Sequence, residues 1–257
     1  MGLAERGVLY PARLPTFHRA PAPGRVAALV RWFWIPEWRI APGRTSRQHL
    51  IAFPACNLVV EPAAVTLSGP TTRSSHRDLT GTGWAVGALL RPAAVPHFLD
   101  DPATLRDAAR PLSLPALADP VRRAMNGPGE RRDRAVEAFV DWLVATVPAP
   151  SDEGLLANAM TDVIDADESI RTVEDAAARL RISPRTLQRL ARRYVGLPPL
   201  AMIRRARLQR AAERLRADPA ANLAALAADL GYTDHAHLAN EFRTVLGLTP
   251  SGYRQGS

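Results

Sequence analysis

Short apolar stretches, each bounded by proline or glycine, dominate the first 100 residues of the chain. Stretches with such boundaries are typical of β-strands. Several short strands at regular spacing favour a β-barrel or a β-sandwich. We therefore expect strands over Val26–Ile35, Leu50–Phe53, Asn57–Val60, Val65–Leu67 and Trp84–Leu90.

The apolar spacing changes to a helical period between residues 102 and 147. It predicts a short helix from Asp101-Pro102 to about Ala109, then helices over Pro115–Met125 and Arg131–Val147. Two interpretations of the last helix are open: it pairs with its copy in a dimer, or it packs on the N-terminal strands. The proline-rich polar stretch 148–152 is the best domain boundary.

From residue 153 onward every predicted element is helical. Ser183 is suited to cap a helix, because its hydroxyl accepts from a free backbone N–H, and Pro184 follows at the first helical position. The long helix from Pro198 to about Ala217 should span about 30 Å at 1.5 Å per residue. The predicted helices are Leu155–Ile164, Val173–Leu180 after Thr172, Pro184 to Gly196, Pro198–Ala217, Leu223–Leu230 and Asp234–Leu246 before Gly247.

The C-terminal segment contains an internal repeat at an offset of about 51 residues. Each copy has a short helix, a tight turn and a capped second helix, which is the pattern of a helix-turn-helix unit. The sequence therefore predicts two such units joined by one rigid helix. The matched pairs are Leu187 with Leu238, Val195 with Leu246, Gly196 with Gly247, Leu197 with Leu248, and Pro199 with Pro250.

Charge is distributed unevenly along the chain. The net charge is +8, and the 33 basic residues are all arginine. Residues 176–216 hold twelve arginines and one acid (12 − 1 = +11), whereas residues 152–175 hold eight acids and one arginine (1 − 8 = −7). Such an excess of basic residues on a helix-turn-helix pattern indicates a surface that binds phosphates.

Composition excludes several other classes of protein. The single cysteine, Cys56, rules out an internal disulfide and a multi-cysteine zinc site, and we expect it to be a buried apolar side chain. No apolar run reaches the ~18 residues that span a bilayer, and the N-terminus has no export signal, so we expect a cytoplasmic protein that does not contact membranes.

The segment GYTDHAHLANEFRTVLGLTPSGYR (231–254) resembles the closing signature of the AraC/XylS family of transcription regulators, and RISPRTLQRLARRYVGLPPLAMIRRARLQRA (181–211) is similar to that family's first unit. The resemblance implies that both recognition helices enter successive major-groove segments of duplex DNA. One helical turn of DNA is about 34 Å, near the expected length of the linking helix.

The resemblance implies that the base-contacting positions of the first unit are Arg185, Gln188 and Arg189. Their chemistry suits this role, because arginine pairs with guanine and glutamine with adenine. Arg192 and Arg193 are expected to contact phosphates. In the second unit the matching positions are His235, Ala236 and Asn240, with Arg243 beyond them. The remaining expected DNA contacts are Ser183, Thr186, Thr233 and His237.

The two units differ in chemistry. Asn240 stands where many relatives carry arginine, Glu241 adds a negative charge beside it, and Ala236 offers only a methyl contact. We therefore expect the first unit to dominate affinity and the second to set register. His235 and His237 point about 200° apart on a helix and cannot share a metal ion.

The N-terminal segment resembles, more weakly and over about residues 10–112, the cupin-like sensor domains that precede such DNA-binding domains. The expected fold is α+β, with a cupin-like β-barrel (1–112), a helical linker with a dimerisation role left open (113–150) and an all-α DNA-binding domain (151–257). Barrels of this kind hold one small ligand. The candidate effector-binding residues are Trp32, Trp34, Trp38, His49, Phe53 and Trp84.

The expected partners are duplex DNA and a small-molecule effector, with RNA polymerase and a second copy of the chain as further candidates. We expect no metal, because the histidines of the N-terminal segment are scattered, no other cofactor and no enzymatic activity. The alternative is an enzyme or DNA-repair module fused to a DNA-binding domain. A single cysteine, and the absence of a Gly-x-Ser-x-Gly elbow, a P-loop or a Rossmann glycine pattern, argue against it.

Overall fold

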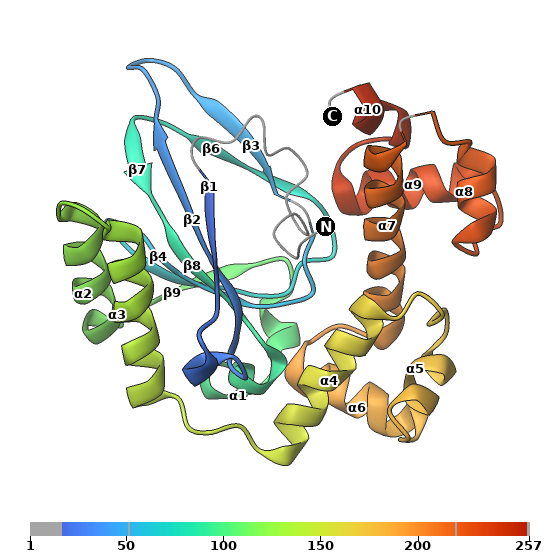
Figure 1. Cartoon of the computed structure of the whole chain (residues 1–257), viewed down its shortest axis with the longest axis horizontal. Helices are drawn as coiled ribbons and strands as arrows, with labels where there is room; N and C mark the ends of the chain where they lie inside the picture. The colour runs from blue at the N-terminus through green and yellow to red at the C-terminus, as the bar shows by residue number, and fades with distance from the viewer. Residues whose placement is uncertain (1–16, 51, 219, 256–257) are drawn as a thin grey trace.

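The computed structural model describes residues 17–50, 52–218 and 220–255, so the first sixteen residues of the expected sensor domain lie outside it. Strands occupy one side of the molecule and helices α4 (Asp152–Ala166) to α10 (Pro250–Gln255) the other, as Figure 1 shows. In the described chain, no helix is both long and apolar enough to cross a membrane.

The strands form a seven-stranded antiparallel sheet, in which β7 pairs with β2, and a separate two-stranded ribbon. The pairings among the described strands run from β1 to β9 in an open series. In sheet order the strands are β1 (Phe17–Pro21), β2 (Val30–Arg39), β8 (Val86–Leu90), β4 (Asn57–Val60), β5 (Val65–Ser68) and β9 (Ala109–Leu112), with β7 (Thr82–Trp84) beside β2 and the ribbon made by β3 (Ser46–Leu50) and β6 (Ser75–Leu79).

Alternation along β2 explains which face of the sheet is covered. Phe33 and Ile35 are fully buried in a core with β4, β5 and β8. Successive side chains of a strand point to opposite faces, so Trp34 lies on the other face. Helices α2 (Pro115–Asn126) and α3 (Arg131–Thr146) complete this core, with Phe139, Val140 and Leu143 buried in it. Of the two interpretations of the helix predicted over Arg131–Val147, packing on the N-terminal strands is therefore confirmed for its apolar side chains.

The expected helix from Asp101 to Ala109 is wrong. A 3₁₀ turn spans Pro102–Leu105, and the chain then enters β9. Asp107 has a φ of +55°, outside the helical region, and its carboxylate accepts from the backbone N–H and hydroxyl of Thr72. Pairing of β9 with β5 therefore replaces the second half of the helix.

The predicted bounds of two other N-terminal strands also differ from those in the structure. β2 begins four residues later than expected because Gly24–Val26 forms a 3₁₀ turn, and β3 ends where a strand was expected to begin. A short helix α1 (Val95–Phe98) follows β8.

The C-terminal domain consists of helices built on two further cores. The first core joins α4 (Asp152–Ala166), α5 (Val173–Arg179), α6 (Pro184–Tyr194) and the start of α7 (Pro199–Ala217). The second joins the rest of α7 to α8 (Leu223–Asp229), α9 (His235–Leu246) and α10 (Pro250–Gln255). Gly196 and Gly247, which match in the sequence repeat, both have a φ near +80° (76° and 79°) just after a recognition helix, a conformation that glycine adopts without steric cost.

Candidate nucleic-acid interface

The first helix-turn-helix unit comprises α5 and α6. A reciprocal capping box of Thr172 and Asp175 starts α5, and the hydroxyl of Ser183 accepts from the backbone N–H of Thr186 at the start of α6. The apolar side of α6 is buried, with Leu187 and Leu190 fully covered. Because this side of α6 is buried, its opposite side faces solvent.

The solvent side of α6 carries all the expected base- and phosphate-contacting residues of this unit. At about 100° per residue, Arg185, Gln188 and Arg192 lie within about 60° of one another around the helix axis. Arg189 and Arg193 form a neighbouring stripe beside α4. All five side chains are exposed.

The stripe beside α4 carries an acidic partner. The carboxylate of Glu153, in the first turn of α4, accepts hydrogen bonds from Arg189, from Arg193 at 2.8 Å and from the Tyr194 hydroxyl at 3.0 Å. The hydrogen bond from Arg189 holds the pKa of Glu153 below its usual range. Arg185 and Arg192 have no ion pair with a described acid.

The second unit comprises α8 and α9. Asn222 caps α8, and the Asp234 carboxylate accepts from the backbone N–H of His237 at 2.7 Å, so that Asp234 caps α9. The expected contact residues of this unit are all exposed: Thr233, His235, Ala236, His237, Asn240 and Arg243.

Glu241 does not face the same side as Asn240. It accepts a hydrogen bond from the Tyr232 hydroxyl at 3.0 Å, and lies 3.8 Å from both Arg204 and the Nε2 atom of His237. Its side chain is only 21% exposed. The negative charge expected beside Asn240 is therefore turned inward. At the positions that match Arg185 and Arg189 of α6, this helix exposes Ala236 and Asn240.

Helix α7 connects the two units. Its 19 residues give a length of about 28 Å at 1.5 Å per residue, which is less than one helical turn of DNA by about 6 Å. Leu208, Ala211 and Leu215 of α7 belong to the second core, and Met202 and Ile203 to the first. The helix therefore fixes each unit through buried contacts.

The N-terminal domain contacts α4 closely. Arg31 and Arg91 form ion pairs with Asp165 and Asp162, and the Asn158 amide donates to the Ala28 carbonyl at 2.8 Å. It also accepts from the backbone N–H of Ala93 at 2.9 Å. α4 is thus held on one side by the sheet domain and reaches α6 through Glu153.

The N-terminal domain also contacts the end of each recognition helix. After α6, Arg106 donates to the Gly196 carbonyl at 2.7 Å. At the end of α9, the backbone N–H groups of Ala52 and Ser74 donate to the carbonyls of Val245 and Thr244 at 3.2 and 3.1 Å. The sheet domain therefore contacts both units directly.

Arg205 of α7 is the most deeply buried charge of the interface between the domains, at 6% exposed. Its Nε atom donates to the Ala52 carbonyl at 2.7 Å, and its guanidinium lies 4.0 Å from the centre of the Phe53 ring. Burial lowers the pKa of Arg205 to about 10, which still leaves it charged at neutral pH.

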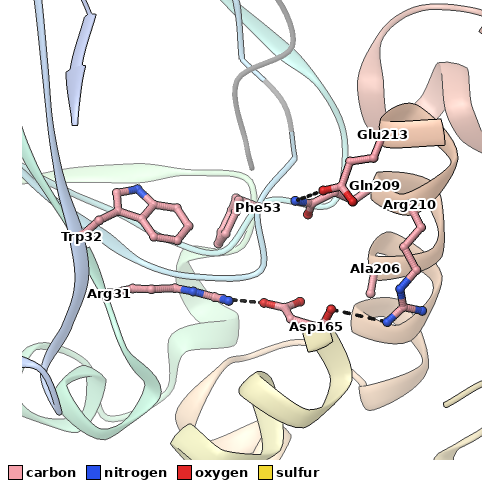
Figure 2. A pocket seen from close by; sticks show the side chains of 8 residues that line it. All are labelled: Arg31, Trp32, Phe53, Asp165, Ala206, Gln209, Arg210 and Glu213. Carbon is pink, nitrogen blue, oxygen red and sulfur yellow. Dashed lines mark hydrogen bonds and ion pairs between the residues drawn. The ribbon is translucent and has the colours of Figure 1, made fainter. Parts of the chain in front are cut away.

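The cavities lined by described residues bring together only two of the candidate effector-binding residues. Trp32 and Phe53, whose rings meet edge to face, line a cavity between the domains together with Arg31 and Asp165 (Figure 2). It holds about 10 Å³ of free space, and a neighbouring cavity lined by Phe53 and Arg91 about 20 Å³. Each has room for about one water molecule.

The other candidates lie elsewhere. A Cβ placed on Gly87 or Gly83 would come within 2.4 Å of the rings of Trp34 or Trp38, so each ring packs on a glycine of a neighbouring strand. Trp84 is buried in the N-terminal core, and the His49 side chain lies outside the described part of the chain. Among the residues described, no group of three or more His, Cys, Asp or Glu is placed to hold a metal ion.

Two kinds of functional residue were missed in the sequence. Glu153 belongs to the acidic segment 152–175, whose composition does not show that Glu153 pairs with Arg189 and Arg193. Arg31, Arg91 and Arg205 carry no local signal, because each interacts with a residue 71 to 153 positions away.

Two family models match the chain. A helix-turn-helix domain matches residues 176–256, and a domain of unknown function, DUF6597, matches residues 18–109. The first begins within α5 and covers α6 to α10, and the second covers most of the sheet.

Two proteins described as AraC-like transcription regulators are similar to this chain, one from Streptomyces antibioticus at 31% identity and one from Streptomyces lividans at 32%, each over 123 residues. The matched segment is 48% of this chain, but only 39% and 38% of those relatives. Among solved structures, ToxT from Vibrio cholerae O395 aligns over 87% of this chain and 97% of its own, at 10% identity and a TM-score of 0.45.

Proposed function

We propose that this chain is a transcription regulator of the AraC family that reads a specific sequence in duplex DNA, which its helix-turn-helix match and its similarity to two AraC-like transcription regulators support. The observation that carries the proposal is the pair of capped recognition helices, α6 and α9, whose exposed sides hold the residues suited to base edges. The twelve arginines of residues 176–216 supply charge for phosphate binding.

In this proposal Arg185, Gln188 and Arg189 read bases, and Arg192 and Arg193 contact phosphates, with Ser183 and Thr186 at the helix start. The second unit contributes His235, Ala236, Asn240 and Arg243, flanked by Thr233 and His237. Arg185 is exposed and has no ion pair with a described acid, which supports the greater weight of the first unit, since bidentate arginine–guanine pairs are the commonest specific contact.

The N-terminal domain is proposed to sense a small molecule, and its strands to form a cupin-like barrel. Its contacts with α4, α6, α7 and α9 support a regulatory role, because a change in the sheet domain reaches both units. The two cavities that described residues line between the domains are too small for an effector, so binding in either of them requires the domains to separate. RNA polymerase and a second copy of the chain are proposed as further partners, and the cytoplasm as the compartment.

The domain division is proposed at 1–112, 113–150 and 151–257. A change of core supports the boundary near 150, since the core of the N-terminal sheet ends at Val147 and the first core of the C-terminal helices begins at Ala157. Residues 113–150 share the core of the sheet, so we treat them as a support of the N-terminal domain.

The test is selection of duplexes from a randomised library by the full chain, followed by gel-shift titration from 50 to 300 mM salt. We expect one enriched sequence with two half-sites about one helical turn apart. Its affinity should exceed that for random duplex by at least ~10³-fold, and fall steeply with salt. Enrichment of no sequence, with only weak binding at low salt, would overturn the proposal.

A further inference from the structure

The acids before the basic block are mostly engaged with arginines. Of the eight acids in residues 152–175, two pair with arginines of the N-terminal domain. Asp167 pairs with Arg179 and Glu168 with Arg214, both on helices of the C-terminal domain. Only Glu153 pairs with arginines of a recognition helix.

Glu153 makes three contacts with one helix. Arg189 and Arg193 are one turn apart on α6, and both donate to its carboxylate, as does Tyr194. The Glu153 side chain is 28% exposed, whereas Arg189 is 56% and Arg193 57% exposed. The two guanidinium groups thus remain accessible to DNA while they are directed toward α4.

The backbone of Glu153 is itself held in place. A Cβ on the next residue, Gly154, would lie 3.2 Å from the Cβ of Ala93 in the N-terminal domain, so α4 approaches that domain closely at this point. One turn later Asn158 bonds to Ala93 and Ala28. The carboxylate therefore stands at a position set by both domains.

We propose that Glu153 is a positioning residue of the DNA-binding surface, which holds Arg189 and Arg193 back from indiscriminate phosphate contacts and so raises the discrimination of α6 between sequences. The proposal rests on the proposed function and deepens it. Ion pairs with exposed partners are weak, so a correctly placed guanine or phosphate displaces Glu153 at little cost. A random sequence offers fewer such contacts, so the carboxylate competes better there.

The test compares Glu153→Gln with Glu174→Gln in the full chain. Both remove one negative charge, but Glu174 is an exposed residue of α5 with no ion pair to a described arginine. The probes are the duplex selected by the wild-type chain and a random 30-base-pair duplex. Titrations at several salt concentrations give an affinity and a salt slope for each.

For Glu153→Gln we expect affinity for random duplex to rise about three- to tenfold, with a salt slope steeper by about 1–2 units as one or two more phosphates are contacted. Affinity for the selected duplex should change by less than about twofold, so the ratio of the two affinities falls. In an Arg189→Gln, Arg193→Gln background the same substitution should have no effect. Glu153→Asp, which keeps the charge, should retain more of the discrimination than Glu153→Gln.

Equal behaviour of Glu153→Gln and Glu174→Gln in slope and ratio would overturn this inference alone. A Glu153 that is merely structural predicts weaker binding to both duplexes and a lower melting temperature, with an unchanged ratio. Failure of the wild-type chain to select any sequence overturns the proposed function, and this inference with it.

Discussion

At the scale of single residues, a glycine can be required by its backbone conformation, by a close neighbour from elsewhere in the chain, or by both. Gly196 ends α6 with a φ of +76°, which the repeat in the sequence indicates. It also touches the N-terminal domain, since an added Cβ would lie 2.6 Å from the backbone nitrogen of Ala103. Gly129 has a similar φ of +74°, but the nearest atom to an added Cβ is the end of the Arg134 side chain at 3.6 Å.

These two glycines separate backbone strain from a clash between domains. Gly129→Ala should lower the free energy of unfolding by about 1–2 kcal/mol through strain. Gly196→Ala should lower it by a further ~1–3 kcal/mol, because the methyl group meets a backbone that must shift. Urea titrations of both variants check this, and equal losses would show that α6 and the sheet domain separate without cost.

Cys56 provides a prediction of pH dependence. Burial raises the pKa of its thiol to about 12. An unfolded chain loses this proton near pH 8.5, so the folded state binds it more tightly and the contribution to stability is lost as pH rises from about 8.5 to 12. Between pH 8 and pH 10 the wild-type chain should lose about 2 kcal/mol more stability than Cys56→Ala. Parallel losses in the two proteins, measured by urea unfolding, would contradict this.

At the scale of elements, the two recognition helices share a geometry but not a chemistry. Ser183 and Asp234 cap them in the same way, and buried leucines face inward in both. The first helix offers arginines to the solvent where the second offers His235, Ala236 and Asn240. Residues at matching positions of α6 and α9 should therefore contribute unequally to sequence-specific binding.

Alanine substitutions on the selected duplex test this asymmetry. Arg185→Ala should weaken binding by about 5- to 150-fold, equivalent to the ~1–3 kcal/mol of a bidentate contact. Asn240→Ala and His235→Ala should each cost less than about threefold, if they contribute mainly to positioning. Arg39→Ala, on an exposed strand end of the N-terminal domain, controls for the loss of one positive charge. Comparable losses at Arg185 and Asn240 would contradict the asymmetry.

How far the sequence predicts an element depends on how local its causes are. Helices α4 to α9 were predicted to within a few residues, because caps such as Ser183 and Thr172 and the 3.6-residue period act within one helix. Helix α10 was not predicted. The ribbon of β3 and β6 was not, because β6 is Ser-His-Arg-Asp-Leu and buries only Leu79. A strand with polar residues on both faces shows no alternation. Phe17–Pro21 and Ala109–Leu112 became strands only through partners elsewhere in the chain.

At the scale of the whole molecule, the same limit hides the contacts that couple the domains. Asp165 was read as part of an acidic run, yet it pairs with Arg31, 134 positions away. Both side chains are largely buried, at 17% and 19% exposed. By contrast, the ion pair of Arg25 with Asp141 lies on the surface of the N-terminal domain, with 49% and 61% of the side chains exposed. These two pairs allow one substitution to be compared in two settings.

Removal of the buried partner should uncouple the domains. Asp165→Asn leaves the Arg31 charge at the interface without its carboxylate, and should lower the free energy of unfolding by about 1–3 kcal/mol. Asp141→Asn should cost less than about 1 kcal/mol. All five tryptophans precede residue 143, so tryptophan fluorescence reports the N-terminal domain, while the circular dichroism at 222 nm reports mainly the C-terminal helices. In urea the two signals should change together in the wild-type chain and in Asp141→Asn, and separate in Asp165→Asn. Coincident transitions in all three proteins would show that the Arg31–Asp165 pair does not hold the sheet domain against α4, and that regulation through α4 must use other contacts.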